Sequence, residues 1–353
     1  MPDNNFWKGK RVFLTGHTGF KGAWLSSLLL DAGADITGYS LAPCTGESLF
    51  NLLNLSRQIS SVIGDIRNLD TLKKVFLNAN PEIIFHLAAQ PLVTESYHNP
   101  VYTYETNVMG TVNILECARI YGTARSIVNV TTDKVYLNKE WHWGYRENDR
   151  LCGHDPYSNS KSCSELATRS YIDSFFYAAE AAAISTARSG NVIGGGDFSP
   201  GRIIPDCVRA AHKHQTIAVR NPDSTRPYQH VLECLHGYML LAQKQYEDKN
   251  KYAGSYNFGP NDACCITTGE LVSLFCRKWG SGQTWESAGI DGPHEASLLK
   301  LDCSRARAAL GWKPVWTIDD ALDKAVEWYR SWEHREDMAK LTSRQIHSFL
   351  SNA

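Results

Sequence analysis

Near the start of the chain, a short run of β-branched and aromatic residues stops at a glycine-rich loop, and an apolar segment follows. The run spans residues 10–15 and the apolar segment spans 23–30. The loop between them reads Gly16-His17-Thr18-Gly19-Phe20-Lys21-Gly22. A strand, a glycine loop and a helix in this order are typical of a dinucleotide-binding turn, because glycines let the backbone approach a pyrophosphate and the helix N-terminus offers free N–H groups. The loop therefore predicts a dinucleotide-binding α/β sheet.

The ends of the next predicted strands indicate which dinucleotide binds. Strand 35–40 ends at Tyr39-Ser40, where such sheets carry an acid for the adenosine ribose, and no arginine follows closely to receive a 2′-phosphate. We therefore expect NAD, with Ser40 at a weakly held ribose. Strand 60–64 leads to Asp65-Ile66, which is placed to meet the adenine amino group. The next strand, from residue 83, ends in Leu87-Ala88-Ala89, where small side chains let the cofactor pass over the sheet edge.

The order of the predicted elements gives the architecture. Strands and helices alternate up to residue 187, which predicts a Rossmann-type, doubly wound parallel sheet with right-handed crossovers. From residue 188 the sequence changes to a glycine-dense loop followed by short elements. We expect residues 1–187 to form the NAD-binding domain, with 230–258 returning to it. Residues 188–229 and 259–353 are expected to form a smaller C-terminal α/β substrate lobe.

Candidate chemistry lies at the end of the predicted strand 126–130 and on the helix that begins at Pro156. The strand leads to Thr132-Asp133-Lys134, a hydroxyl, a carboxylate and an amine side by side. Tyr157 and Lys161 are one helical turn apart and share a face of the helix. A cation beside a phenol lowers the phenol's pKa, and a phenolate can take a proton from a sugar hydroxyl as hydride leaves the same carbon. The pattern therefore predicts alcohol oxidation.

Composition excludes several classes of partner and site. The formal net charge of −1 gives no reason to expect nucleic acid. The ten cysteines are scattered, with no spacing that resembles a metal site. No apolar run approaches the roughly 20 residues that span a bilayer, and the polar start Met1-Pro2-Asp3-Asn4-Asn5 has no signal-peptide core. We expect a cytoplasmic protein.

The motifs together resemble the extended short-chain dehydrogenase/reductase superfamily over residues 6–332. The shared features are the glycine loop, Asp65-Ile66, His86-Leu87-Ala88-Ala89, Asn107, Thr132 and Tyr157-x-x-x-Lys161. Within the superfamily the chain is most similar to the CDP-glucose 4,6-dehydratases. The segments that carry this finer resemblance are Phe6-Trp7-x-Gly9-Lys10, the loop 16–22, Thr132-Asp133-Lys134-Val135-Tyr136, residues 191–197 and Ile204-Pro205-Asp206.

The resemblance implies a reaction without net redox on CDP-glucose. NAD takes hydride from C4 of the glucosyl unit while Tyr157 accepts the hydroxyl proton and Thr132 hydrogen-bonds the same oxygen. Water then leaves across C5–C6, with Asp133 protonating the C6 hydroxyl, and hydride returns to C6. The product is a 4-keto-6-deoxy sugar, which feeds bacterial dideoxysugars of the O-antigen. The resemblance also implies a homodimer or homotetramer.

The base that takes the C5 proton is left open by the sequence. The related dTDP-glucose enzymes have a glutamate where this chain has Lys134. A lysine serves as a base only when neutral; alternatively, Lys134 stays charged and stabilises the enolate, with another group or water as base.

Five residues are candidates for contacts with the substrate. Arg202 and Arg226 suit bidentate contacts with the diphosphate. Asn191 is assigned by the resemblance, and Gln90 is a further candidate. Asn107 lies within the predicted helix 101–121, where an asparagine is either bonded locally or functional.

Three other activities compete with dehydration. An NDP-sugar 4-epimerase shares everything except an acid–base pair after Thr132, so Asp133 and Lys134 argue against it. A ketoreductase that consumes NADPH is disfavoured because no residue receives a 2′-phosphate. A non-catalytic NAD-binding regulator would not need Thr132, Tyr157 and Lys161 together.

Overall fold

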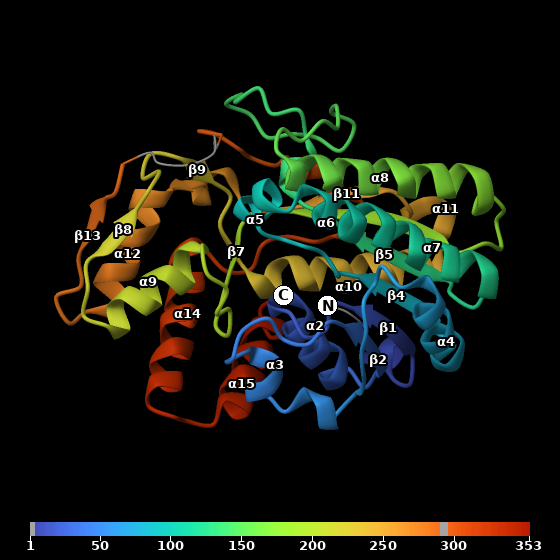
Figure 1. Cartoon of the computed structure of the whole chain (residues 1–353), viewed down its shortest axis with the longest axis horizontal. Coiled ribbons are helices and arrows are strands. Elements are labelled where there is room, and N and C mark those ends of the chain that lie inside the picture. The colour runs from blue at the N-terminus through green and yellow to red at the C-terminus, as the bar shows by residue number, and fades with distance from the viewer. Residues whose placement is uncertain (1–3, 290–295) are drawn as a thin grey trace.

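A seven-stranded parallel sheet forms the centre of the molecule (Figure 1). The computed structural model describes residues 4–289 and 296–353, so the first three residues of the polar start lie outside it. The strand order is β11-β6-β5-β4-β1-β2-β3, which confirms the predicted doubly wound α/β class. The strands are β1 Arg11–Thr15, β2 Asp35–Ser40, β3 Ser60–Ile63, β4 Ile83–His86, β5 Ser126–Val130, β6 Ala183–Ser189 and β11 Ser255–Phe258.

Helices cover both faces of the sheet because alternate strand residues point to opposite sides. Val12 and Leu14 of β1 belong to the hydrophobic core on the side of α2 and α10. Phe13 belongs to a second core on the side of α4 and α7. The covering helices are α2 Phe20–Asp31, α4 Leu69–Ala79, α7 Gly110–Tyr121, α8 Pro156–Phe175 and α10 Val231–Glu247.

The helix predicted over 101–121 is continuous but changes its winding in the middle. It begins as α6, Pro100–Tyr104, continues as one π-helical segment, Glu105–Met109, and ends as α7. Asn107 lies in the π-helical segment, a kind of bulge that is frequent at functional sites. This segment packs against α8, which carries Tyr157 and Lys161.

The elements at the left of Figure 1 form a smaller α/β unit beside the carboxyl ends of the sheet strands. Three two-stranded sheets pair β7 with β10, β8 with β13, and β9 with β12. Their bounds are β7 Val192–Ile193, β8 Ile217–Val219, β9 Thr225–Arg226, β10 Gln229–His230, β12 Ile266–Thr267 and β13 Trp285–Ser287. Its helices are α9 Ile203–His212, α12 Thr268–Trp279 and α14 Ile318–Glu333. Helix α15 Met338–Leu350 packs on α14, and α13 Ser304–Leu310 packs on β11 and α10. The division at residue 188 stays a prediction.

The remaining described elements are short. They are α1 Asn4–Trp7, α3 Leu49–Leu52, α5 Val93–His98 and α11 Lys249–Tyr252, with 3-10 turns at Leu55–Arg57, Asp133–Val135 and Asp262–Cys264. Helix α15 was not anticipated from the sequence. Its buried residues recur at helical spacing, and Asp337 caps its first turn.

Candidate active site

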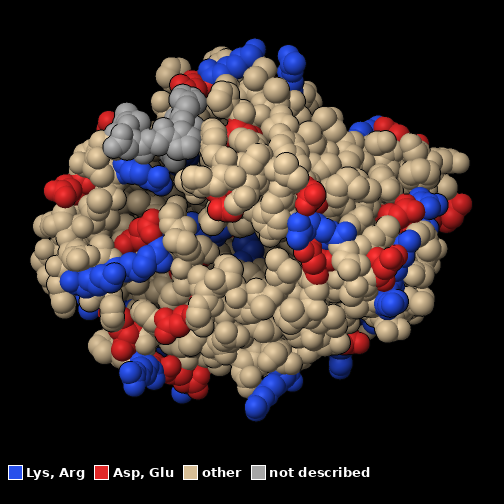
Figure 2. Space-filling model, in the orientation of Figure 1, with Lys and Arg blue, Asp and Glu red and all other residues tan. Residues whose placement is uncertain are grey.

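A cavity of about 1210 Å³ runs from the glycine loop to the smaller unit. Figure 2 shows a hollow at the centre of this face, with basic side chains in it and beside it. Most residues singled out in the sequence line the cavity: Gly16, Thr18, Gly19, Phe20, Lys21, Gly22, Ser40, Asp65, Ile66, Leu87, Ala88, Ala89, Gln90, Thr132, Lys134, Tyr157, Lys161, Asn191, Arg202 and Arg226. Three do not line it: His17, Asn107 and Asp133. No cluster of His, Cys, Asp and Glu in the described part of the chain could hold a metal ion.

The glycine loop is packed too tightly for any side chain at two of its positions. A Cβ on Gly22 would lie 2.1 Å from the carbonyl oxygen of Gly16, and a Cβ on Gly16 would lie 2.8 Å from the backbone nitrogen of Ala88. Gly19 is the N-cap of α2 and has no side chain to cover the first N–H groups of that helix. The loop therefore presents bare backbone to the cavity, which fits a pyrophosphate.

The adenosine end of the cavity has one hydroxyl and one carboxylate. Strand β2 ends at Ser40, so its last residue offers the ribose a hydroxyl and no carboxylate. Ser40 Oγ lies 2.9 Å from Thr18 Oγ1. Asp65 is held by Arg67, whose Nη2 lies 2.7 Å from Asp65 Oδ2. Hydrogen bonding from Arg67 keeps the pKa of Asp65 below its usual value. Asp65 is thus an anionic acceptor beside the cavity.

His17 was expected at the cofactor, but the structure places it behind the loop. Its ring packs over Gly38 of β2, where a Cβ would lie 2.4 Å away, and its Nε2 lies 2.7 Å from Ser61 Oγ. Burial lowers the pKa of His17 to about 4, so the ring is neutral. His17 supports the loop and has no access to the cavity.

Lys21 points from the first turn of α2 toward the end of β6. Its Nζ donates to Ser189 Oγ at 2.8 Å, and Tyr238 donates to the same hydroxyl at 2.8 Å. Burial lowers the pKa of Lys21. Ser189 was not anticipated from the sequence, although it ends a strand in which every residue is buried.

Tyr157 and Lys161 both line the cavity, and burial has the largest effect on the pKa of the phenol. The Lys161 ammonium donates to the backbone oxygen of Val130 at 3.1 Å. Burial raises the pKa of Tyr157 to about 12, and the hydrogen bond with Thr132 offsets this only in part. Burial and then Lys21 lower the pKa of Lys161 to about 8. Burial thus opposes ionisation of Tyr157, and its role as a phenolate base stays a prediction.

Thr132, Asp133 and Lys134 form one hydrogen-bonded row. Thr132 Oγ1 donates to Asp133 Oδ1 at 2.9 Å, and Lys134 Nζ lies 3.1 Å from the same oxygen. Lys134 also donates to Asn191 Oδ1 at 3.1 Å. The Asp133 side chain is fully buried, whereas that of Lys134 is 28% exposed. Lys134 therefore faces the cavity and Asp133 lies behind it, which contradicts the expectation that Asp133 itself touches the substrate.

Gln90 and Asn107 were expected to contact substrate, but both side chains are used within the protein. The Gln90 amide bonds Leu92 and Thr103. Asn107 accepts from the backbone nitrogen of Gln90 at 2.8 Å and donates to its backbone oxygen at 3.1 Å. A further bond joins Asn107 to Ser160 on α8. Asn107 thus fixes the position of a cavity-lining loop relative to the helix of Tyr157.

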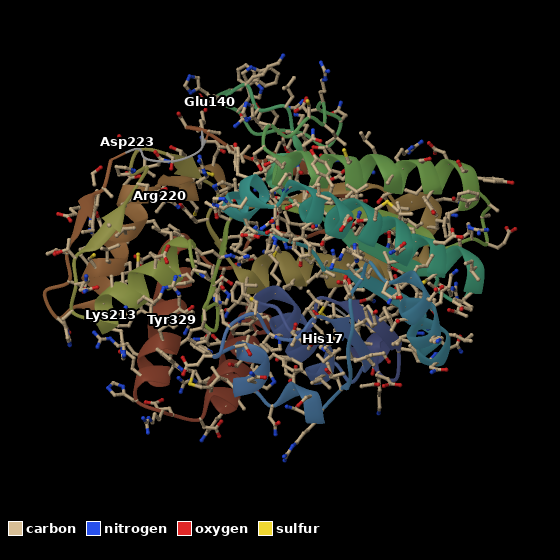
Figure 3. The ribbon with its side chains drawn as sticks, viewed as in Figure 1. His17, Glu140, Lys213, Arg220, Asp223 and Tyr329 are labelled. Atoms are coloured by element: carbon tan, nitrogen blue, oxygen red, sulfur yellow. The ribbon has the colours of Figure 1, made fainter. Side chains whose placement is uncertain are left out.

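The two predicted arginines enter the cavity wall from the smaller unit. Arg202 lies at the start of α9 and is paired with Asp197 at 2.9 Å. Arg226 is buried in β9. Figure 3 places Arg220 and Glu140, two further cavity-lining residues that the sequence did not single out, far from His17. This end of the cavity therefore has several charged groups for a second ligand beside the dinucleotide.

A buried ion pair beneath the site was also missed. Glu165, one turn after Lys161, accepts from Arg188 of β6 and from Thr131 Oγ1. Both partners are at most 3% exposed. The sequence signal for this ion pair was Arg188 itself, a charged residue in the otherwise uncharged strand β6, in which every residue is buried.

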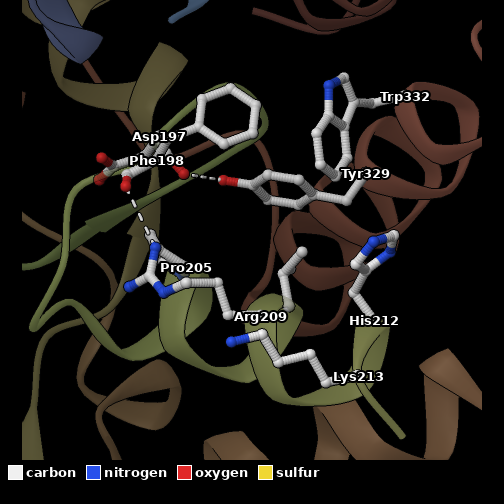
Figure 4. A pocket seen from close by; sticks show the side chains of 9 residues that line it. Asp197, Phe198, Pro205, Arg209, His212, Lys213, Tyr329 and Trp332 are labelled. Atoms are coloured by element: carbon white, nitrogen blue, oxygen red, sulfur yellow. Dashed lines mark hydrogen bonds between the residues drawn. The ribbon is translucent and has the colours of Figure 1, made fainter. Parts of the chain in front are cut away.

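A second, smaller cavity of about 70 Å³ lies behind the loop 197–205 (Figure 4). Tyr329 donates to the backbone oxygen of Asp197 across it. Its lining is aromatic and aliphatic around Phe198 and Trp332, with Arg209 and Lys213 at its edge. The hollow is too small for a nucleotide.

Comparison with known proteins agrees with this site. The family model described as GDP-mannose 4,6 dehydratase matches residues 13–325. A CDP-glucose 4,6-dehydratase of Salmonella typhimurium is 46% identical, and the alignment covers 99% of both chains. The chain therefore belongs to the GDP-mannose 4,6 dehydratase family, within the extended short-chain dehydrogenase/reductase superfamily.

Solved structures share the fold. A dTDP-glucose 4,6-dehydratase double mutant of Streptomyces venezuelae has a TM-score of 0.80 at 22% identity, covering 92% of this chain and 98% of the other. A UDP-glucose 4-epimerase of Thermotoga maritima has a TM-score of 0.78 at 19% identity, covering 91% and 99%. The same architecture therefore serves dehydratases and epimerases, and the side chains must decide between the two reactions.

Proposed function

We propose that the chain is an NAD-dependent CDP-glucose 4,6-dehydratase, which converts CDP-glucose to CDP-4-dehydro-6-deoxyglucose. The observation that carries this assignment is one cavity in which a bare glycine loop meets Tyr157, Thr132 and Lys134. The near full-length relative with this activity supports the substrate.

The residues present fit NAD. Backbone of the glycine loop would hold the pyrophosphate, Asp65 the adenine amino group and Ser40 the ribose, while Ala88 and Ala89 leave room over the sheet edge. NAD, when bound, supplies a hydride acceptor for C4 that later returns the hydride to C6. Arg202 and Arg226 are placed for the diphosphate of the sugar nucleotide, and Asn191 lies beside Lys134.

We assign oxidation at C4 to Tyr157 and Thr132, which both line the cavity. The resulting 4-ketone acidifies the C5 proton, so water can leave across C5–C6. Lys134 Nζ lies 3.1 Å from Asp133 Oδ1, at the wall of the cavity. Lys134 can act there as an acid, as an enolate-stabilising cation or, when neutral, as the C5 base.

An NDP-sugar 4-epimerase is the second candidate, since the fold serves both reactions. The pair Asp133–Lys134 favours dehydration, because epimerisation needs no acid at C6. Incubation with CDP-glucose and catalytic NAD tests the choice. We expect a 4-keto product that absorbs in the ultraviolet on addition of base, without accumulation of NADH. A CDP-hexose that keeps its C6 hydroxyl would contradict the assignment.

A homodimer or homotetramer is part of the proposal. Large apolar side chains are exposed on the neighbouring helices α6, α7 and α8 and on the π-helical segment between the first two: Val101, Met109, Ile120, Leu166 and Phe175. Such a face is typical of a protein interface. No helix in the described ranges is long and apolar enough to cross a membrane. We further place the enzyme in the cytoplasm and in dideoxysugar synthesis for the O-antigen.

A further inference from the structure

We propose that His86 is a positioning residue for the dinucleotide, held as the neutral tautomer that carries its proton on Nε2. In this form it fixes the Thr15 hydroxyl, which in turn fixes the backbone of Leu87 and Ala88. The inference rests on the proposed use of NAD. It gives a role to His86, which precedes the cavity-lining residues Leu87, Ala88 and Ala89 but does not line the cavity itself.

Four buried side chains form a hydrogen-bonded row from the end of β1 to α8. Thr15 Oγ1 lies 2.8 Å from His86 Nδ1, and His86 Nε2 lies 3.2 Å from Thr111 Oγ1. Thr111 Oγ1 lies 2.8 Å from Ser164 Oγ, on the helix that carries Tyr157. Each side chain of the row belongs to a residue that is at most 1% exposed, so bulk water does not reach these bonds.

A backbone oxygen sets the direction of the bonds in this row. Thr111 Oγ1 lies 2.7 Å from the backbone oxygen of Asn107, which can only accept, so the single proton of Thr111 is used there. The Thr111 oxygen must then accept from both Ser164 and His86, and Nε2 of His86 therefore carries a proton. Burial lowers the pKa of His86 to about 3, so the ring is neutral and its Nδ1 is unprotonated.

The unprotonated Nδ1 of His86 fixes the Thr15 hydroxyl. Thr15 donates its proton to this nitrogen, which leaves both lone pairs of the hydroxyl oxygen to accept. They accept from the backbone nitrogens of Leu87 and Ala88, each at 3.1 Å. The opposite tautomer would donate to the Thr15 oxygen and leave one lone pair for two N–H groups. It would also place an unprotonated Nε2 against the Thr111 oxygen.

The backbone that Thr15 holds lies directly against the glycine loop. A Cβ on Gly16 would lie 2.8 Å from the backbone nitrogen of Ala88 and 2.9 Å from the carbonyl carbon of Leu87, so the two segments touch. Gly16, Leu87 and Ala88 all line the cavity that fits NAD. A shift of Ala88 therefore moves the surface on which the dinucleotide would lie.

Two substitutions separate the roles of the two ring nitrogens. His86→Asn places an amide oxygen where Nδ1 lies, so it still accepts from Thr15 but does not reach Thr111. His86→Gln reaches Thr111 with its amide nitrogen but leaves Thr15 without its acceptor, so the hydroxyl is free to turn away from the backbone N–H groups. Thr168→Val is the matched control, because it removes a buried hydroxyl of α8 that bonds Asn129 and lies outside the row.

The Kd for NAD, measured by fluorescence titration, should distinguish these variants. We expect His86→Gln to raise it about tenfold, the size of the loss when a buried N–H group loses its acceptor. His86→Asn and Thr168→Val should keep the wild-type Kd. Both His86 variants lose one bond of the row, so their free energies of unfolding in urea should fall alike, and stability cannot explain different affinities. Thr15→Val should behave as His86→Gln and serves as a second variant if the glutamine protein does not fold.

The tautomer is measured directly on the wild-type protein without NAD. Proton–nitrogen correlation NMR of protein with labelled histidines distinguishes a protonated from an unprotonated ring nitrogen. We expect His86 to show a protonated Nε2 and an unprotonated Nδ1 in neutral and in mildly acidic buffer. The signal is assigned by its absence from the spectrum of His86→Asn.

Two results would overturn the positioning role. One is a His86 ring that is charged or protonated on Nδ1, since the Thr15 hydroxyl would then not be held as described. The other is an equal NAD affinity in His86→Asn and His86→Gln, which would mean that the ring only fills space. Failure of the proposed function would be seen separately, as wild-type protein that binds NAD but does not dehydrate CDP-glucose.

Discussion

Arg188 of β6 forms an ion pair inside the protein with Glu165 of α8, the helix that also carries Tyr157 and Lys161. Arg188 Nε lies 2.7 Å from Glu165 Oε1, and the side chains are 2% and 3% exposed. Arg188 also donates to Tyr136, and Glu165 accepts from Thr131. The pair thus joins β6, α8 and the segment between Thr131 and Tyr136.

Replacement of Arg188 by methionine should destabilise the protein by about 3–5 kcal/mol, because Glu165 is left as an uncompensated buried charge. The measurement is the free energy of unfolding in urea. Arg169→Met is the matched control. Arg169 lies on α8, the helix of Glu165, in an exposed pair with Asp173, so its loss should change stability little. A loss at Arg188 no larger than that at Arg169 would show that the pair is solvated in solution.

Tyr157→Phe should reduce turnover of CDP-glucose by about 10²–10⁴-fold, because no group then accepts the C4 hydroxyl proton. NAD affinity should stay at the wild-type value, measured by fluorescence titration. Tyr171→Phe removes a hydroxyl from the same helix whose one hydrogen bond among the described residues is with Glu116, and it should keep full activity. Preserved turnover in the Tyr157 variant would refute the role of this phenol.

Much of the fold follows from the sequence because its signals are local. The glycine spacing, the strand runs and the alternation of elements each depend on neighbours in the chain, and the structure confirms the parallel sheet that they predict. Tyr157 and Lys161 share a helical face for the same reason. Helix α15 was not predicted, although its buried residues recur at helical spacing.

The parts of the site that sequence reasoning misplaced depend on contacts between distant segments. Nothing near His17 in the chain indicates that its ring packs over Gly38, and nothing near Gln90 indicates that Asn107 holds its backbone. The pKa of Tyr157 was expected to fall because spacing reveals a nearby cation, whereas burial, the larger effect here, depends on the whole cavity wall. Glycine patterns and helical spacing therefore locate a site, and burial decides which side chains reach it.

NAD should bind weakly because the end of β2 has Ser40 where an acid would hold the ribose. We expect the purified protein to contain much less than one NAD per chain. Ser40→Asp should lower the Kd for NAD about tenfold, a gain of the size expected for a charged hydrogen bond. Reduced nicotinamide mononucleotide lacks this ribose, so its affinity should be the same in both proteins. Wild-type protein recovered fully loaded with NAD would count against weak binding.

Lys134→Met should spare oxidation at C4 and stall the loss of water, because the variant lacks the amine that lies at the cavity wall beside Asp133. With CDP-glucose, NADH should accumulate instead of remaining transient. CDP-6-deoxy-6-fluoroglucose provides the control, since fluoride leaves without a proton and its release should fall much less than that of water. Equal losses with both substrates would mean that Lys134 acts at C5, as a base or as a cation beside the enolate.

Glu233 should make the protein lose stability as the pH rises from about 4.5 to 7. Its carboxyl is fully buried on α10 and accepts from the backbone nitrogens of Val315 and Trp316. Burial raises its pKa from 4.5 to about 7, and the two backbone N–H groups oppose that shift. Since the folded pKa lies above the unfolded one, the folded state binds the proton more tightly. The resulting stability is fully present below pH 4.5 and is lost through pH 7, by roughly 3 kcal/mol.

Glu233→Gln keeps an oxygen for Trp316 but cannot ionise. The free energy of unfolding of this variant should therefore rise relative to that of wild type between pH 4.5 and 8. Urea unfolding of both proteins across this range measures the difference, in which the titration of every other group cancels. A difference independent of pH would mean that Glu233 has the same pKa in the folded and the unfolded protein.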